Sequence, residues 1–218
     1  MDLLNDVDVR VLGALIEKEI TTPENYPLSL NALMNACNQT SNRDPVVKFD
    51  EATVKAGVDR LRKYSLVRSI QRVDSRVMKY MHLMTDALGL ERPQLAAMCV
   101  LMLRGPQTVG EIRTRGSRLF EFQSLEEVEA TLHGLASRSP PLVVRLPRQP
   151  GQKEARYAHL LSGEVAIEAA PPGGAASSVE PSPVEPSRID VLAQSVAALS
   201  DEVADLRAEV AELRKLFE

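Results

Sequence analysis

Tryptophan is absent from this sequence, and aromatic residues, cysteine and long apolar runs are all scarce. The 218 residues include four Tyr, four Phe, two Cys and three His. The core must therefore be built mainly from aliphatic and Met side chains. No run of 18 apolar residues is present, and the stretch Met1–Asp6 has no basic residue. We expect neither a membrane span nor a signal peptide, and hence a cytoplasmic protein.

Residues that usually build catalytic or metal sites are also few. Cys37 and Cys99 each lie within an apolar helical pattern, which is typical of small core residues in a reducing compartment rather than of a redox or metal motif. The sequence has no metal-ligand spacing, Gly-rich phosphate loop, nucleophile elbow or acid–base dyad. It therefore predicts a protein without metal or cofactor that is not an enzyme.

An internal repeat is the clearest feature that is present. The segment Lys79–Leu83 (KYMHL) returns as Arg156–Leu160 (RYAHL), and Leu66–Val67 returns as Leu142–Val143. Three apolar positions upstream also recur: Val54, Val58 and Leu61 correspond to Val128, Leu132 and Leu135. The offsets stay between 74 and 77 residues across all three elements. Such near-constant spacing indicates two copies of one structural unit.

Each copy contains a helical pattern followed by two strands. In the first copy, the helix spans Asp50–Tyr64, with buried positions at helical spacing and an acidic N-cap. Strand patterns follow at Leu66–Ile70 and Val77–Leu83, on either side of a turn. A helix leading into a hairpin, after shorter helices, is the layout of a winged helix. We therefore expect a mainly α fold with small β-hairpins (α+β), organised as tandem winged-helix domains over 1–86 and 87–164.

The other helices are predicted from their caps and apolar stripes. One covers residues 5–20, and a second begins after Ser29. Residues 94–103 are apolar on every side, so this helix should be buried between the two copies. Capping boxes at Thr108-x-x-Glu111 and Ser124-x-x-Glu127 predict two further helices.

Charge is distributed unevenly along the chain. Residues 1–164 contain 22 Lys and Arg against 20 Asp and Glu, whereas residues 165–218 contain 4 against 10. Within residues 43–79 there are ten basic side chains and five acidic ones. This local excess lies on the elements that would face DNA, and it is a modest electrostatic footprint for nucleic acid.

The first copy has the residues expected to contact DNA. On a helical wheel its last helix turns Ala52, Ala56, Asp59, Arg60 and Lys63 outward, and the alanines would let the backbone approach a groove. Asp59 would repel phosphate unless it accepts from a cytosine amino group. The preceding loop, residues 38–45, has side chains suited either to turns and helix ends or to DNA contacts. Six residues of the loop, helix and hairpin are predicted to contact DNA: Asn42, Arg43, Arg60, Lys63, Arg72 and Arg76.

The second copy is a poorer candidate for reading a groove. The outward positions of its last helix include Glu126, Ala130 and His133, with no Lys or Arg. Phosphates surround any groove, so such a face is unfavourable there. Basic residues elsewhere in this copy either contact the DNA backbone or are simply solvated. We expect a supporting or partner-binding module.

The C-terminal part differs in composition from the body. Residues 165–187 are rich in Ala, Pro, Gly and Ser, which predicts a disordered linker. Residues 188–218 follow a heptad pattern with a and d positions at Ile189, Leu192, Val196, Leu199, Val203, Leu206, Val210 and Leu213. β-Branched residues at a and Leu at d favour a parallel two-stranded coiled coil, and hence a homodimer. A trimer, a coil with a partner protein, and docking on the body of the same chain are the alternatives.

Several segments resemble the YceH-like family of bacterial proteins. They are Cys37–Pro45 (CNQTSNRDP), Leu103–Thr108 (LRGPQT), Glu111–Arg115 (EIRTR) and Arg156–Leu161 (RYAHLL). The resemblance covers roughly residues 5–163 and implies a tandem winged-helix fold. It implies no activity, because this family is uncharacterised and has no assigned catalytic residues. The linker and the heptad pattern lie outside the matching segments.

Together these features favour a non-enzymatic DNA-binding protein of the transcriptional-regulator type that acts mainly through its first winged helix. The alternative is a protein–protein adaptor that uses tandem winged helices as a scaffold without nucleic acid. Asp59 and the acidic C-terminal part favour the adaptor. The basic stretch in residues 43–79 favours DNA binding.

Overall fold

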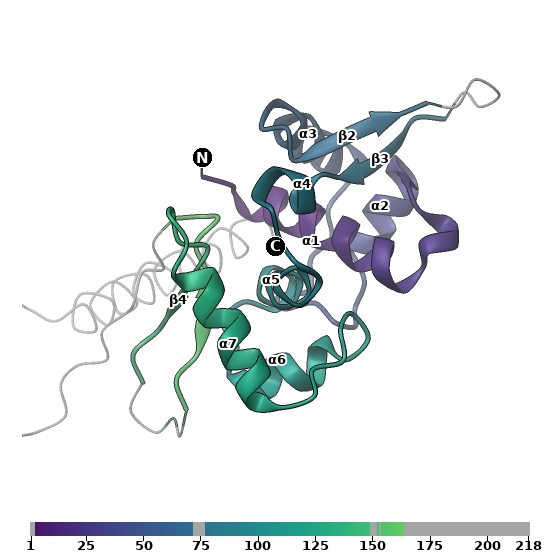
Figure 1. Ribbon diagram of the computed structural model, residues 1–218. Helices are drawn as coiled ribbons and strands as arrows, with labels where there is room; N and C mark the ends of the chain where they lie inside the picture. Colours follow the sequence, from purple (N-terminus) through teal and green to yellow (C-terminus); the bar gives the residue numbers. More distant parts are fainter. Residues whose placement is uncertain (1–2, 72–76, 149–151, 153, 164–218) are drawn as a thin grey trace, which may run out of the picture. The chain divides into compact units, whose positions relative to one another are not determined.

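A computed structural model of the protein describes residues 3–71, 77–148, 152 and 154–163 (Figure 1). All of them belong to one compact unit, Met1–Pro171. Both predicted winged-helix domains are therefore parts of this unit. The predicted linker and heptad helix, 165–187 and 188–218, lie outside the described residues, as do Arg72 and Arg76 of the first hairpin.

The described chain is a mixture of helices and small antiparallel sheets. Its N-terminal half consists of α1 (Asp6–Thr21), η1 (Pro23–Asn25), β1 (Leu28–Ser29), α2 (Leu30–Cys37), α3 (Glu51–Lys63), β2 (Val67–Ile70) and β3 (Lys79–His82). A short helix, α4 (Met84–Leu88), leads to the C-terminal half: α5 (Arg92–Arg104), α6 (Val109–Gly116), α7 (Leu125–Ala136), β4 (Val143–Arg145) and β5 (Tyr157–His159). Within the described residues, the helices predicted over 5–136 and the strands of both predicted hairpins are present.

The helix caps explain where these elements begin. Asn5 and Asp8 form a reciprocal capping box on α1, and Thr108 and Glu111 form the predicted one on α6. At α7 only half of the predicted box exists. The hydroxyl of Ser124 accepts the Glu127 N–H, but the Glu127 carboxylate accepts the N–H of Gln123 instead.

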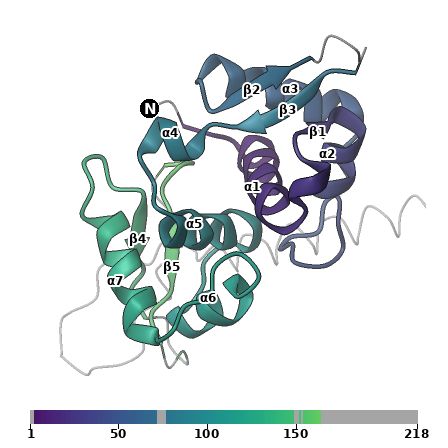
Figure 2. The same ribbon diagram turned by 45° about the vertical axis from the view of Figure 1, so that its right-hand side comes forward.

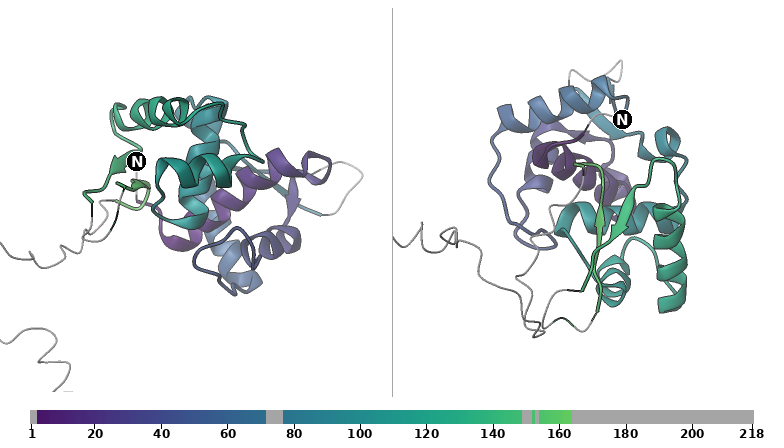
Figure 3. Two further views of the ribbon diagram at one scale, coloured as in Figure 1. Left: turned by 90° about the horizontal axis from the view of Figure 1, so that it is seen from below. Right: turned by 90° about the vertical axis from the view of Figure 1, so that its left-hand side faces the viewer.

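Each half has one small antiparallel sheet. In the N-terminal half the strand order is β1-β3-β2, with Leu28 opposite Tyr80 and Val67 opposite His82. In the C-terminal half β4 pairs with β5, and an isolated antiparallel bridge joins Gln107 to Tyr157. The right-hand view of Figure 3 shows these two strands beside α7.

The core is continuous through α1 and α5. Leu95–Leu103 are all buried, as the all-round apolar pattern predicts. α5 packs against α1 on one side and against α6 and α7 on the other (Figure 2). The two helices approach closely at Gly13, where an added Cβ would lie 2.9 Å from Cδ2 of Leu103. This packing joins the two halves into one body.

A bilayer-crossing helix would need a long, apolar stretch, and no helix among the described residues has both properties.

Candidate nucleic-acid interface

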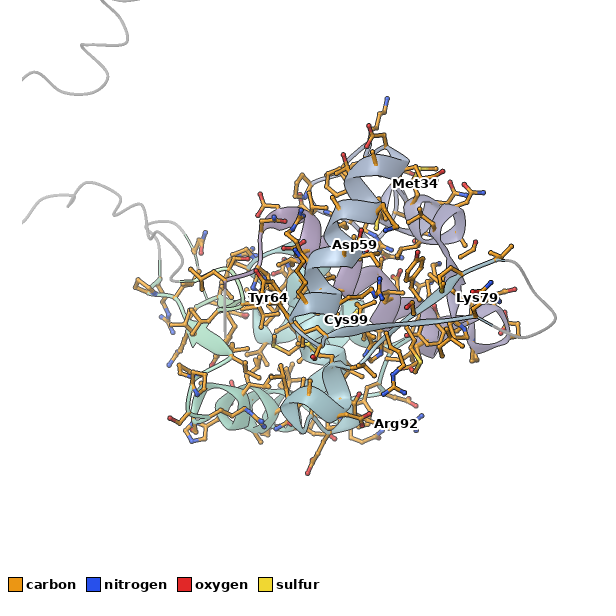
Figure 4. The ribbon with its side chains drawn as sticks, turned by 90° about the horizontal axis from the view of Figure 1, so that it is seen from above. Met34, Asp59, Tyr64, Lys79, Arg92 and Cys99 are labelled. Atoms are coloured by element: carbon orange, nitrogen blue, oxygen red, sulfur yellow. The ribbon has the colours of Figure 1, made fainter. Side chains whose placement is uncertain are left out.

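The packing of α3 against α1 decides which side of α3 faces solvent. The buried positions of α3 are Val54, Gly57, Val58 and Leu61. An added Cβ at Gly57 would lie 3.0 Å from Cγ1 of Val7, so the helices touch there. The opposite face of α3 remains open. Figure 4 looks onto this face, with Asp59 near the middle of the helix and Lys79 on the adjacent hairpin.

The open face of α3 contains the predicted small and charged residues. Ala52, Ala56 and Lys63 are exposed, as the helical wheel predicts. Asp59 lies between two cations, 2.5 Å from Nζ of Lys55 and 3.6 Å from Nη1 of Arg62. The hydrogen bond from Lys55 is the main reason why the pKa of Asp59 is lowered. The carboxylate on this face is therefore ionised and already accompanied by positive charge.

Arg60 does not face outward as predicted. Its Nε and Nη2 atoms lie 2.9 and 2.8 Å from Oδ1 of Asp8, which belongs to α1 and has a side chain only 2% exposed. Burial of the carboxylate makes this pair a structural connection between α1 and α3. The Arg60 side chain lies on the flank of α3 and is 35% exposed, but its guanidinium group is directed to Asp8.

Arg43 is also placed differently from the prediction. It is buried, with Nη2 2.6 Å from Oε2 of Glu17, and it donates two further hydrogen bonds to the carbonyl oxygen of Ala36. A guanidinium so enclosed cannot reach phosphate without unfolding the loop. Arg43 instead fastens the loop of residues 38–45 to α1 and α2.

Asn42 is half-buried in the loop before α3. Its φ of 58° places it in the left-handed region, which Asn tolerates better than most residues. Its side-chain oxygen accepts a hydrogen bond from Arg104 at the end of α5. The side-chain oxygen of Asn42 is therefore engaged with the end of α5.

The hairpin beside α3 contributes both basic and apolar side chains. Arg68 is exposed on β2 and Lys79 is half-buried on β3. Ile70, Val77 and Met78 are exposed large apolar residues. Arg62 and Lys63 of α3 are also exposed, and α3 packs beside β2, which contains Arg68. Four of the six predicted DNA contacts lie within the described residues. Of these, Lys63 is exposed on this surface, whereas Asn42, Arg43 and Arg60 are half-buried or buried. Arg72 and Arg76 lie outside the described residues.

The family described as "Protein of unknown function, DUF480" matches residues 4–152. The chain belongs to this family. It is 52% identical over 200 residues to a UPF0502 protein of Opitutus terrae, covering 91% of this chain and 84% of the relative. It is 51% identical over 221 residues to one of Geobacter sulfurreducens, covering 99% of each. The expected membership of an uncharacterised bacterial family is confirmed.

In this DUF480 chain the last helix of the C-terminal half, α7, has an acidic outer face. Glu126, Glu129, Ala130 and His133 are exposed, and α7 contains no Lys or Arg. Leu125, at its start, is 44% exposed. The difference in charge between α3 and α7 predicted from the sequence is therefore present on exposed surfaces.

Equivalent histidines in the two hairpins have different surroundings. Nε2 of His82 lies 2.7 Å from Oε2 of Glu19, and its Nδ1 accepts the N–H of Met84. This pattern assigns the proton to Nε2. In the C-terminal half, Nδ1 of His159 has no hydrogen-bond partner among the described residues, and burial lowers the pKa of this ring. The sequence repeat alone did not reveal this difference.

Both cysteines are buried, as expected. Burial raises the pKa of the Cys37 thiol to about 12 and raises that of Cys99 as well. Neither thiol is activated for nucleophilic chemistry in this state. Within the described ranges, His, Cys, Asp and Glu form no group of three that could hold a metal ion.

Proposed function

We propose that the DUF480 body consists of two winged-helix domains and that the protein binds DNA through the first. The order of elements supports the fold assignment. Three helices and a hairpin occur as α1, α2, α3 and β2–β3, and again as α5, α6, α7 and β4–β5. In each half the hairpin is joined by a short third strand or a bridge. This arrangement is typical of winged helices.

The proposal that the first domain binds DNA depends mainly on the charge of its last helix, α3. α3 contains four basic residues, of which Arg60 is engaged with Asp8, and two acidic ones. α7, the last helix of the second copy, contains three Glu and neither Lys nor Arg. On the open face of α3, exposed alanines leave space for a backbone and cations lie beside them. A groove-binding helix needs both properties, because phosphates line the groove on each side.

The rest of the chain has supporting roles in this proposal. The second domain would act as a rigid support or contact another protein. The heptad segment would pair two chains as a parallel coiled coil. The 23 residues between 165 and 187 would span about 25–30 Å if flexible, so two bodies could bind one duplex at variable spacing. Pairing would then raise the affinity through effective concentration.

The test uses fluorescence anisotropy to measure how tightly the full-length protein binds a random-sequence duplex at a series of salt concentrations. With about six phosphate contacts in a dimer, log K should fall with log salt at a slope of about −5. The decisive variant is K63E/R68E, because both side chains are exposed and lie on α3 and its hairpin. We expect at least about a tenfold loss of affinity and a shallower salt slope.

The matched control is R92E/R145E. It produces the same change of net charge at exposed positions of the C-terminal half. If both double variants lose affinity equally, the overall charge of the protein governs binding and α3 is not the interface. Arg60 is unsuitable for this test, since its replacement would leave the buried Asp8 carboxylate without its cation.

The second candidate function is a protein–protein adaptor, and one observation favours it. Ile70, Val77 and Met78 expose apolar side chains on the first hairpin, whereas a hairpin that only touches phosphate needs none. Absence of salt-dependent DNA binding even at low ionic strength would make the adaptor the preferred function.

A further inference from the structure

Three arginines meet where α1, α5 and α6 come together. Arg104 ends α5, Arg115 lies on α6, and Arg118 follows it. With Glu17 of α1 they line a small cavity of about 10 Å³, which is room for about one water molecule. The elements around this cavity come from both halves of the body. Ligand sites occur preferentially at such junctions between structural units.

Positive charge around this cavity exceeds the available negative charge. Glu17 is the only carboxylate among the described residues that line it. Its Oε2 atom is already 2.6 Å from Arg43, and its Oε1 atom is 3.9 Å from Nη2 of Arg118. One carboxylate is thus shared between two guanidinium groups, and Arg118 is held only loosely.

Arg115 is similarly under-compensated. Its Nη2 atom lies 3.4 Å from Oε1 of Glu111, but the other oxygen of Glu111 is 2.9 Å from Arg156. The second hydrogen bond of Arg115 goes to the side-chain oxygen of Gln107, which is neutral. Here too, a single carboxylate serves two arginines.

Arg104 has the least favourable surroundings of the three. Its guanidinium donates to the neutral side-chain oxygen of Asn42, and no carboxylate of the described residues forms an ion pair with it. Burial lowers the pKa of Arg104, and the charges of Arg115 and Arg43 lower it further, while the carboxylates of Glu17 and Asp44 partly oppose this shift. Guanidinium groups that crowd together in this way repel one another, and a bound anion would remove the repulsion.

We propose that Arg104, Arg115 and Arg118 form a binding site for the phosphate group of a small ligand. Arginine matches the geometry of phosphate oxygens and donates paired hydrogen bonds to them. One phosphate oxygen, similar in size to a water molecule, enters the cavity between the guanidinium groups. Arg118, whose side chain is 62% exposed, closes over the remaining oxygens.

A small ligand fits this site better than a DNA backbone. The cavity admits one oxygen atom, and the carboxylate of Glu17 forms part of its wall. The Glu17 side chain is only 7% exposed and lies 2.6 Å from Arg43, so its carboxylate is already paired with a cation before an anion enters the cavity. The site is distinct from the open face of α3 and is independent of the proposed DNA binding.

The experiment measures binding of inorganic phosphate to the full-length protein by isothermal titration calorimetry, with ionic strength held constant by sodium chloride. We expect saturable binding at one site per chain. R118Q should weaken it at least about tenfold, because charge-assisted hydrogen bonds are lost. R92Q removes an exposed arginine elsewhere and should leave it unchanged. R104Q should also abolish binding, with circular dichroism to check that the variant is folded.

Three outcomes would overturn the proposal. One is absence of saturable phosphate binding to the unmodified protein. Another is equal weakening in R118Q and R92Q, which would indicate only general attraction of anions. The third is saturable phosphate binding that is unchanged in both R118Q and folded R104Q, which would place the bound phosphate at another site.

Discussion

Arg60 of α3 and Asp8 of α1 form an ion pair in which the carboxylate is almost fully buried, with Nη2 of Arg60 2.8 Å from Oδ1 of Asp8. This pair, together with the apolar contacts of Gly57 and Val58, fixes the rotation of α3 about its own axis. Because of this ion pair, the three cations near the end of α3 have different roles. Arg60 holds the helix in place, while Arg62 and Lys63 face solvent.

Replacing Arg60 by Ala should therefore destabilise the protein far more than replacing Lys63. R60A leaves the Asp8 carboxylate buried without its cation, which costs about 2–3 kcal/mol of unfolding free energy. K63A removes an exposed side chain and should change the unfolding free energy by less than about 0.5 kcal/mol. Urea unfolding followed by circular dichroism measures both. Equal midpoints for the two variants would contradict the structural role of Arg60.

Replacing Arg43 should destabilise the protein even more, because both Arg43 and its partner Glu17 are buried. R43A should cost about 3–5 kcal/mol, because Glu17 and the carbonyl oxygen of Ala36 lose their donor together. R43K should recover only part of this stability, because an ammonium group cannot reproduce the several hydrogen bonds of the guanidinium. The control is K48A, an exposed position a few residues further along the same connection. Full stability of R43A would show that the loop is not anchored through this residue.

The sequence alone predicted the positions of most helices and strands, but not the partners of Arg43 and Arg60. Apolar periodicity and capping boxes located the helices within a few residues, and the repeat located both hairpins. Periodicity cannot say which arginine of an amphipathic helix finds a carboxylate. The partners of Arg43 and Arg60 are 26 and 52 residues away in the chain. Only the tertiary packing of α1 brings them together.

One of these pairs did leave a signal in the sequence. Asp8 lies within the apolar stripe of α1, at helical spacing from Leu12, Leu15 and Ile16, so it had to be buried with the stripe. A buried carboxylate needs a cation. Glu17 gave no such signal, since it lies opposite that stripe. The strand β1, with two residues, and the five-residue helix α4 are too short for any periodicity to show.

Two glycines, Gly13 in the close contact between α1 and α5 and Gly110 on the open side of α6, should respond to substitution in opposite directions. G13V would place methyl groups where an added Cβ already lies 2.9 Å from Leu103, and overpacking of this kind costs about 1–3 kcal/mol. G110A, on α6, meets nothing within 4 Å and gains helix propensity, so it should stabilise the protein by about 0.5 kcal/mol. Thermal unfolding of the two variants would show shifts of opposite sign. A stabilised G13V would mean that the helices can separate without cost.

His159 should make stability depend on pH in mildly acidic solution. Burial lowers its pKa in the folded state, while Asp6 opposes this shift. The unfolded chain, with a His pKa of about 6.5, therefore takes up the proton first as the pH falls. Its contribution is fully present above about pH 6.5 and is lost progressively below that value. Urea midpoints at pH 7.5 and 5.5 should differ less in H159Q than in the unmodified protein. H133Q, at an exposed position, should keep the full difference.

The heptad pattern makes a prediction about assembly that charge variants of the full-length chain can test. In a parallel coil, Leu199 and Leu206 occupy d positions at the interface, whereas Ala197 and Ala204 occupy b positions that face solvent. L199D/L206D should therefore convert a dimer to a monomer in light scattering, while A197D/A204D, with the same added charge, should remain a dimer. If the dimer is lost, DNA affinity should also fall, because the effective concentration of the second body is removed. A dimer that persists in L199D/L206D would show that the chains associate through another surface, and the DNA-binding body would then have to contain its own interface.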